Sequence, residues 1–319
     1  MKEFHLWDFI HHNLLKNNAV ILIAVVNHET GSPGKEGFKM AVSSNGDYTG
    51  SIGGGVMEYN ALRECKGFFK NKTSVRKIEK LYHNRKSTSN KSGLICAGSQ
   101  TNFTISFEKR DLKLIENILE FIKLYKPGKI QFSSDGIKIL RVKKNDSVYF
   151  YNFIKDSNWK YEEIIGLKNY VYIIGGGHVG LAVSKVMSML DFFVTIYDDR
   201  KNLLMLKQST FANKIITGSF KKTGSKIKEG NQTYIVIVTK SYISDKESLI
   251  SVLNKNVRYI GIMGTKVKIK KIFNDVVKEG IKKEQLKKVN APIGIDINSD
   301  TPEEIAVSIA AEIIRIKNS

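Results

Sequence analysis

The pattern of hydrophobic and polar residues changes near the middle of the chain. In the first half, short apolar runs and amphipathic stretches are separated by turn-forming residues, which is typical of an α+β domain. From Asn169 onward, continuous apolar runs of strand length alternate with helical patterns, as expected for strands that helices cover on both faces. We therefore predict an α/β protein. Residues 1–160 should form a smaller N-terminal α+β domain with a connecting region, and residues 161–319 a Rossmann-type C-terminal domain with a parallel sheet.

The spacing of apolar residues also predicts the elements of the N-terminal domain. Helical spacing occurs at residues 4–16, 56–69 and 112–125. Strand-length runs lie at residues 20–26, 38–43, 48–52, 75–82, 100–107, 137–142 and 148–153. Asn45-Gly46 indicates a hairpin, Pro127-Gly128 should end the third helix, and residues 143–146 should form the turn between the last two strands. We expect the domain boundary in the polar stretch 155–167.

In the C-terminal domain, apolar strands at residues 170–174, 193–197, 234–239 and 258–263 alternate with helices, the first at residues 179–190. This alternation predicts a parallel sheet, wound right-handed, with helices on both faces. Near the C-terminus, Thr301-Pro302-Glu303-Glu304 has the features of a helix start. Thr301 can cap the helix, Pro302 suits its first position, and Glu304 can close a capping box.

Composition excludes several classes of protein. The chain has 319 residues, of which 42% are hydrophobic. Its longest apolar runs, at 19–26 and 234–238, fall well short of the roughly 18 residues that a membrane helix needs. The N-terminus lacks the features of a secretion signal, and two cysteines cannot build a disulfide framework. We expect a cytoplasmic protein that does not associate with membranes.

The net charge of +20 comes mostly from lysine. Such a charge attracts anions, but it can equally reflect solvated helix surfaces. Proteins that bind nucleic acid concentrate arginine and aromatic residues on one face, whereas here lysine is spread over the whole chain. We therefore expect no nucleic-acid partner.

The clearest chemical motif is Gly175-x-Gly177-x-x-Gly180, which follows a predicted strand and opens a predicted helix. Its glycines permit a tight turn, close approach to a pyrophosphate and close packing of helix on strand. The helix N-terminus offers free N–H groups to phosphate. Asp198 follows at the end of the second strand, where an acid can accept from a ribose hydroxyl. His178 could contact a phosphate, cap the helix or point into solvent.

Two other glycine turns precede helices. Gly264-Thr265-Lys266 could bind a second anion, with Lys266 as a point charge, or could be an ordinary turn. Gly53-Gly54-Gly55 exposes backbone N–H groups to a ligand. Glu58, in the first turn of the helix that follows, could bond a heterocycle, balance a metal or favour the helix start.

The two cysteines have different surroundings in the sequence. Cys65 falls on the apolar stripe of its helix and should be buried packing. Cys96 lies between glycines in a loop, where a thiol could react or ligate a soft metal. We find no other metal spacing, no Ser-His-Asp signature and no P-loop, so no catalytic residue is assigned.

Five ordered segments together resemble the XdhC/CoxI family of xanthine dehydrogenase accessory factors. They are residues 50–58 (GSIGGGVME), 94–98 (LICAG), 172–180 (YIIGGGHVG), 259–266 (YIGIMGTK) and 292–297 (PIGIDI) followed by 301–306 (TPEEIA). The last segment is the most specific and adds Asp296 to the candidate cofactor-binding residues.

The chain departs from the family in three places. Val56 stands where the family usually has its first cysteine, Thr239-Lys240-Ser241 replaces a loop where many members carry Thr-His, and Lys266 replaces the usual arginine. These departures concern metal handling more than the fold.

The resemblance implies a cytoplasmic, often dimeric accessory protein. It would bind molybdenum cofactor (molybdopterin), protect it, assist its sulfuration and deliver it to a molybdenum hydroxylase client such as xanthine dehydrogenase. The N-terminal glycine turn, Glu58 and Cys96 would meet the cofactor across from the Rossmann cleft, with Cys96 near the metal. Two alternatives stay open: an NAD(P)-binding oxidoreductase, although the sequence offers no proton relay, and a scaffold that binds only a client enzyme.

Overall fold

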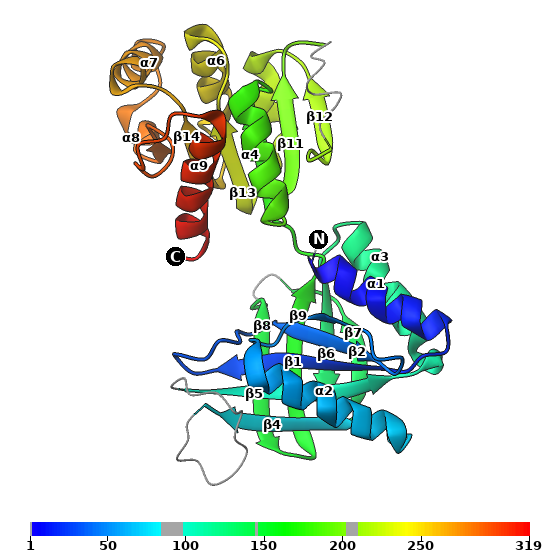
Figure 1. The fold of residues 1–319 in the computed structure, drawn as a ribbon. Coiled ribbons are helices and arrows are strands. Elements are labelled where there is room, and N and C mark those ends of the chain that lie inside the picture. The colour runs from blue at the N-terminus through cyan, green and yellow to red at the C-terminus, as the bar shows by residue number, and fades with distance from the viewer. Residues whose placement is uncertain (1, 84–97, 144–145, 202–209) are drawn as a thin grey trace. The chain divides into compact units, whose positions relative to one another are not determined.

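The computed structural model describes residues 2–83, 98–143, 146–201 and 210–319. These residues form two compact units, Met1–Leu167 and Lys168–Ser319, and each unit has its own sheets and core (Figure 1). The predicted fold class is confirmed. A six-stranded parallel sheet lies in the C-terminal unit, and antiparallel sheets lie in the N-terminal unit.

The N-terminal unit contains two antiparallel sheets. Their strand orders are β3-β2-β1-β5-β4 and β7-β6-β9-β8. The strands are β1 (Val20–His28), β2 (Lys39–Ser43), β3 (Tyr48–Gly50), β4 (Arg76–Tyr82), β5 (Ser99–Phe107), β6 (Gly128–Ser133), β7 (Gly136–Leu140), β8 (Tyr149–Lys155) and β9 (Asn158–Ile165). The helices are α1 (Lys2–Leu15), α2 (Gly55–Lys70) and α3 (Leu112–Lys123), with a short 3-10 helix, η1 (Lys109–Asp111), before α3.

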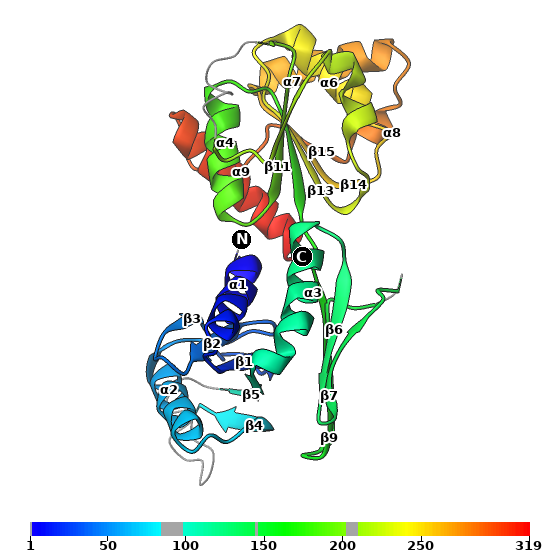
Figure 2. The ribbon, with the colours of Figure 1, turned by 90° about the vertical axis from the view of Figure 1, so that its right-hand side faces the viewer.

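The five-stranded sheet is covered on both faces (Figure 2). Alternate residues of β1, such as Ile21 and Ile23, pack beneath α2 with Met57 and Cys65. The residues between them face a larger core that includes α1, α3 and the second sheet. Phe103 stacks on Trp159 there, with 6.0 Å between the ring centroids. Alternation along each strand thus divides the unit into two cores.

The connecting region differs from the expectation. β6 and β9 were not predicted. β7 pairs with β6 and β8 pairs with β9, so the expected strands at residues 137–142 and 148–153 do not pair with each other. The N–H of Asp146 donates to the carbonyl oxygen of Lys143, as in the expected turn, whose residues 144 and 145 lie outside the described ones. β9 was missed because its buried residues alternate with half-exposed Lys160 and Glu162, so that the stretch looks polar. The expected division between residues 160 and 161 lies within β9, whereas the two units divide after Leu167.

The C-terminal unit is a parallel sheet with the order β12-β11-β10-β13-β14-β15. Numbered within the unit, this order is 3-2-1-4-5-6, the order of dinucleotide-binding Rossmann domains. The strands are β10 (Tyr170–Ile174), β11 (Phe193–Asp198), β12 (Lys214–Thr217), β13 (Gly230–Ile237), β14 (Val257–Ile262) and β15 (Val289–Asn290). The helices are α4 (His178–Met189), α6 (Tyr242–Val252), α7 (Lys266–Lys278), α8 (Lys283–Leu286) and α9 (Pro302–Lys317), with a 3-10 helix, η2 (Phe220–Lys226).

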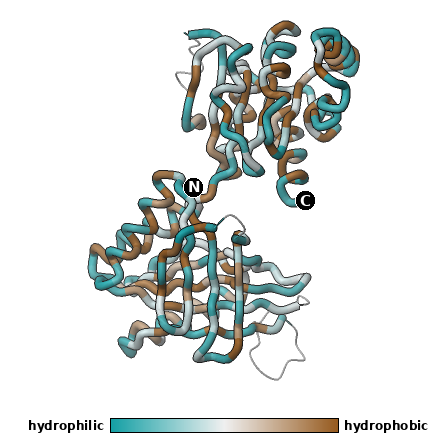
Figure 3. Tube along the Cα trace, turned by 180° about the vertical axis from the view of Figure 1, so that it is seen from behind, coloured by the Kyte–Doolittle hydropathy of each residue, from teal (hydrophilic) through white to brown (hydrophobic). Residues whose placement is uncertain are grey.

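Helices cover both faces of this sheet, as predicted. One core joins the strands to α4 and α9, and the other joins them to α6 and α7. Hydrophobic segments lie inside each unit, and the hydrophilic ones gather in outer loops (Figure 3). The edge strands β12 and β15 were not predicted, because they are short, and β12 is mostly exposed while β15 is half-buried. Among the described residues, no helix has the length and apolar character needed to cross a membrane.

Candidate functional site

The turn after β10 closes so tightly that two of its glycines cannot be replaced. Gly175 has φ +114°, and a Cβ built there would lie 2.4 Å from the carbonyl oxygen of Val238. A Cβ on Gly180 would lie 1.9 Å from the carbonyl oxygen of Gly175. These distances leave no room for a side chain, so the first and third glycines of the motif serve the fold.

Gly177, the second glycine, has a different environment. It is the N-cap residue of α4, where no side chain accepts a hydrogen bond from the helix among the described residues. A Cβ on Gly177 would meet no atom within 4 Å, and the neighbouring His178 is exposed. The first N–H groups of an α-helix have no partner inside the helix. At α4 they are therefore open to an anion from outside.

The two helices that follow β13 and β14 begin at the same edge of the sheet, because parallel strands share their carboxyl edge. Ser241 caps α6 by accepting from the N–H of Ser244, and Thr265 caps α7 by accepting from the N–H of Lys268. Side chains thus occupy donors at both of these helices. Of these helix starts, α4 is the one without a side-chain cap.

Asp198 is 1% exposed and lies beside the glycine turn. Its Oδ2 accepts from the N–H of Gly176 at 2.7 Å and from Nη2 of Arg200 at 2.9 Å, and its Oδ1 accepts from Nε of Arg200 at 2.8 Å. Burial opposes ionisation, but the bonds from Arg200 and Gly176 outweigh it and lower the pKa of Asp198. The carboxylate therefore fixes the turn, and both of its oxygens are engaged before any ribose arrives.

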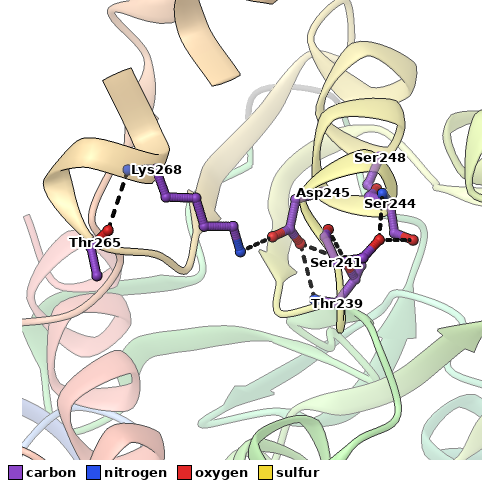
Figure 4. A network of polar contacts seen from close by, with 7 residues as sticks. All are labelled: Thr239, Ser241, Ser244, Asp245, Ser248, Thr265 and Lys268. Carbon is purple, nitrogen blue, oxygen red and sulfur yellow. Dashed lines mark hydrogen bonds and ion pairs between the residues drawn. The ribbon is translucent and has the colours of Figure 1, made fainter. Parts of the chain in front are cut away.

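A second buried carboxylate joins the first turns of α6 and α7 (Figure 4). Asp245 is 1% exposed, and its Oδ1 accepts from Oγ1 of Thr239 at 2.6 Å while its Oδ2 pairs with Nζ of Lys268. Burial is the largest influence and raises the pKa of Asp245. Asp245, Lys268 and Arg200 were not predicted as site residues from the sequence. Of these three residues, only Asp245 could have been found from a local pattern, because it lies four residues after Ser241, which caps the helix.

The remaining C-terminal candidates lie near this edge. Gly264 and exposed Lys266 flank Thr265 at the start of α7. Asp296 is exposed, in a loop that follows β15. Buried Glu312 anchors this loop through Oε2, which accepts from the N–H of Gly294 at 2.9 Å.

In the N-terminal glycine turn, a carboxylate from the helix that follows accepts hydrogen bonds from the turn. Oε1 of Glu58 accepts from Oγ of Ser51 at 2.7 Å, from the N–H of Ile52 at 2.9 Å and from the N–H of Gly54 at 2.8 Å. Partial burial opposes ionisation of Glu58, but these bonds prevail and its pKa is lowered. Glu58 thus stabilises the turn that leads to Gly55 and α2. Gly53 and Gly54 have φ +126° and +85°, a backbone conformation that favours glycine.

The cysteines offer little to a metal in the described residues. Cys65 is 1% exposed, and burial raises the pKa of its thiol to about 12, so it is packing, as predicted. Cys96, the candidate metal ligand, lies outside the described residues. Within the described ranges, no group of three or more histidine, cysteine or acidic side chains could hold a metal ion.

Comparison with protein families decides the assignment. The family described as "XdhC Rossmann domain" matches residues 171–313, and the family described as "XdhC and CoxI family" matches residues 14–79. The chain belongs to the XdhC and CoxI family. The two matched regions fall in different units, so each unit contains one of them.

Individual relatives of this XdhC/CoxI chain are distant. It is 26% identical over 157 residues to the uncharacterized protein YqeB of Escherichia coli (strain K12), a match that covers 48% of this chain and 28% of the relative. It is 24% identical over 145 residues to a probable xanthine dehydrogenase subunit of Bacillus subtilis (strain 168), covering 46% of this chain and 42% of the relative. The chain thus spans less than half the length of either relative.

A solved structure shares the fold of this family member along its whole length. A crystal structure of a xanthine dehydrogenase from Bacillus halodurans matches with a TM-score of 0.77 and 19% identity, over 100% of this chain and 96% of the other. Val56, the first of the three departures expected from the sequence, is exposed in the first turn of α2. The other two departures, at residues 239–241 and at Lys266, lie at the starts of α6 and α7.

Proposed function

We propose that this chain is an accessory protein of a xanthine dehydrogenase-type molybdenum hydroxylase, which binds molybdenum cofactor and assists its maturation and insertion. Membership of the XdhC and CoxI family and the names of two similar proteins support the link to xanthine dehydrogenase. The observation that carries the proposal is the open N-terminus of α4 at Gly177.

The phosphate end of the cofactor fits this helix start. Gly177 has open space above it, and the helix offers unpaired N–H groups and the positive end of its dipole. The cofactor is cargo in this proposal, so the protein needs to bind and release it rather than use it. The metal end has no matching ligand set among the described residues, and we assign it none there.

The phosphate site can be tested with a matched pair of variants. Gly177→Asp would cap α4 with a carboxylate, which keeps the helix stable but repels phosphate. Gly177→Asn would cap it without charge. Each protein is purified from a host that makes molybdopterin, and bound pterin is measured by fluorescence after acid oxidation. We expect pterin with the wild type, much less with Gly177→Asn and none with Gly177→Asp.

The same preparations test the delivery step. Loaded protein should activate a cofactor-free molybdenum hydroxylase, whereas the Gly177→Asp variant should not. The proposal is overturned if the wild type holds no pterin and takes up none when the cofactor is supplied.

The strand order favours a second candidate, an NAD(P)-binding oxidoreductase. The engaged carboxylate of Asp198 counts against ordinary ribose recognition. Titration with NADH and NADPH separates the two functions. Tight binding with hydride transfer to an acceptor would favour the oxidoreductase.

A further inference from the structure

The sheet face beneath α2 contains an unusual row of polar residues. Gln100, Asn102, Thr104 and Ser106 alternate along β5 and all point to this face. Asn102 and Thr104 lie opposite Val25 and Ile23 of β1, which are apolar members of the core under α2. A buried polar side chain normally has a hydrogen-bond partner, so each member of the row needs an account.

Two members of the row have partners within the protein. Nε2 of Gln100 donates to the carbonyl oxygen of Ile52 at 3.1 Å and to Oδ1 of Asn102 at 3.0 Å, while its Oε1 accepts from Oγ of Ser32 at 3.0 Å. Oγ of Ser106 accepts from the N–H of Val75 at 3.0 Å. These contacts explain why Gln100 and Ser106 are polar.

Asn102 and Thr104 are the two remaining members of the polar row on β5. They are 2% and 3% exposed. Among the described residues, Nδ2 of Asn102 and Oγ1 of Thr104 have no hydrogen-bond partner, because the one side-chain bond of Asn102 uses its Oδ1. Both are hydrogen-bonding groups, and because they lie two residues apart on the same face of one strand, they are available together to a ligand.

Both side chains line a cavity of about 180 Å³ between α2 and the sheet. Apolar walls come from Ile23, Met57 and Leu81. Pockets for drug-sized ligands begin at about 300 Å³. This cavity therefore suits one or two fused rings and not a whole dinucleotide.

Two carboxylates at the rim of the cavity provide further hydrogen-bond acceptors. Glu64 from α2 and Glu79 from β4 line it, and one oxygen of each pairs with Nζ of Lys77, at 2.5 and 3.1 Å. The second oxygen of each carboxylate can accept from a ligand. Glu64 is exposed and Glu79 half-buried, so this rim is the side from which a ligand would enter.

We propose that this cavity binds a bicyclic heterocycle with a 2-amino-4-oxopyrimidine edge, as found in pterins and in guanine. The amide of Asn102 and the hydroxyl of Thr104 donate to the ring carbonyl, and a rim carboxylate accepts from the ring N–H and amino groups. Ile23, Met57 and Leu81 contact the ring faces. This inference rests on the proposed function for the choice of a pterin as the first probe, but it concerns a site within the N-terminal unit alone.

The test uses the full chain and unsubstituted pterin, whose fluorescence is followed during titration. Lumazine, which has a second carbonyl in place of the amino group, and adenine, which lacks the carbonyl, are the comparison ligands, and guanosine separates a pterin site from a guanine site. We expect pterin to bind at least tenfold more tightly than lumazine or adenine.

Two nearly isosteric variants remove the contacts. Thr104→Val deletes the hydroxyl, and Asn102→Asp replaces the donor Nδ2 by an acceptor while keeping the oxygen that Gln100 uses. Thr101→Val, on the opposite face of the same strand, is the control. Pterin affinity should fall about fivefold in the first variant and more than tenfold in the second, with the control unchanged. Thermal unfolding by circular dichroism checks that each variant is folded, and Thr104→Val keeps the test usable if Asn102→Asp is not.

The outcomes separate this inference from the proposed function. If pterin does not bind, or binds equally to all variants, the inference is overturned. If the wild type retains molybdopterin and Thr104→Val retains as much, the inference fails while the proposed function stands. If free pterin binds at this cavity but no molybdopterin is ever recovered, the inference stands and the proposed function fails.

Discussion

The two units each contain a glycine turn that leads into a helix, and a carboxylate holds the backbone of each turn. In the N-terminal unit the carboxylate is Glu58, which comes from the first turn of the same helix. In the C-terminal unit it is Asp198, which comes from the next strand of the sheet and is paired with Arg200. The first turn can form from a short piece of chain, whereas the second forms only when β10 and β11 are already side by side.

This difference bears on what each turn can bind. Glu58 occupies N–H groups of Ile52 and Gly54 within its own turn, so fewer donors remain there for a ligand. Asp198 occupies the N–H of Gly176, just before the N-cap residue Gly177, and leaves the start of α4 open. The C-terminal turn is thus the better candidate for a phosphate.

The largest expected effect comes from crowding the C-terminal turn. Gly180→Ala places a Cβ 1.9 Å from a backbone oxygen, so we expect it to destabilise the C-terminal unit by about 3 kcal/mol or more. Gly177→Ala is the matched control, because its Cβ meets open space at φ −77°. Urea denaturation measures both. Equal stability of the two variants would contradict the tight closure of this turn.

Next in size is the loss of the carboxylate that joins two strands. Asp198→Asn keeps the shape but removes the charge that Arg200 and the N–H of Gly176 contact. Because Arg200 is 34% exposed, solvent reduces the loss, and we expect about 2 kcal/mol rather than the larger values of fully buried pairs. Asp199→Asn, next to it and exposed, should change the free energy of unfolding little. A neutral result for Asp198→Asn would mean that the turn does not depend on β11.

The corresponding change in the N-terminal unit should cost less. Glu58→Gln keeps an acceptor oxygen for the turn but loses the charge, and we expect about 1 kcal/mol, in the range of helix caps. Glu120→Gln, on α3 of the same unit and exposed, controls for general loss of charge in thermal unfolding. A cost as large as that of Asp198→Asn would show that the two carboxylates hold their turns equally strongly, although one is local and the other comes from a separate strand.

The same difference between local and distant contacts decides which features could be predicted from the sequence. The glycine spacing, the cap at Thr301 and the capping box with Glu304 depend on residues within a few positions of one another, and the structure has them as expected. The pairing of Arg200 with Asp198, the bond between Asp245 and Lys268 and the polar row on β5 depend on elements that meet only after folding. No local pattern contains that information. β9 was missed for a related reason, since only its buried partners show which of its alternating residues face the core.

The smallest expected effect is a difference in pH dependence between the two buried aspartates of the C-terminal unit. The pKa of Asp198 is lowered on folding, so its contribution to stability is complete above the ordinary aspartate value of about 3.9 and is lost as the pH falls through the lowered value. The pKa of Asp245 is raised by burial, so ionising it on the folded chain costs stability as the pH rises above that ordinary value.

Relative to the wild type, Asp198→Asn should therefore be least stable near neutral pH, and its stability should approach that of the wild type in acid. Asp245→Asn should lose least stability near neutral pH and most in acid, where the protonated carboxyl is no longer penalised. Urea denaturation of the three proteins between about pH 3 and 7 measures this, and parallel pH profiles for the two variants would contradict the opposite signs.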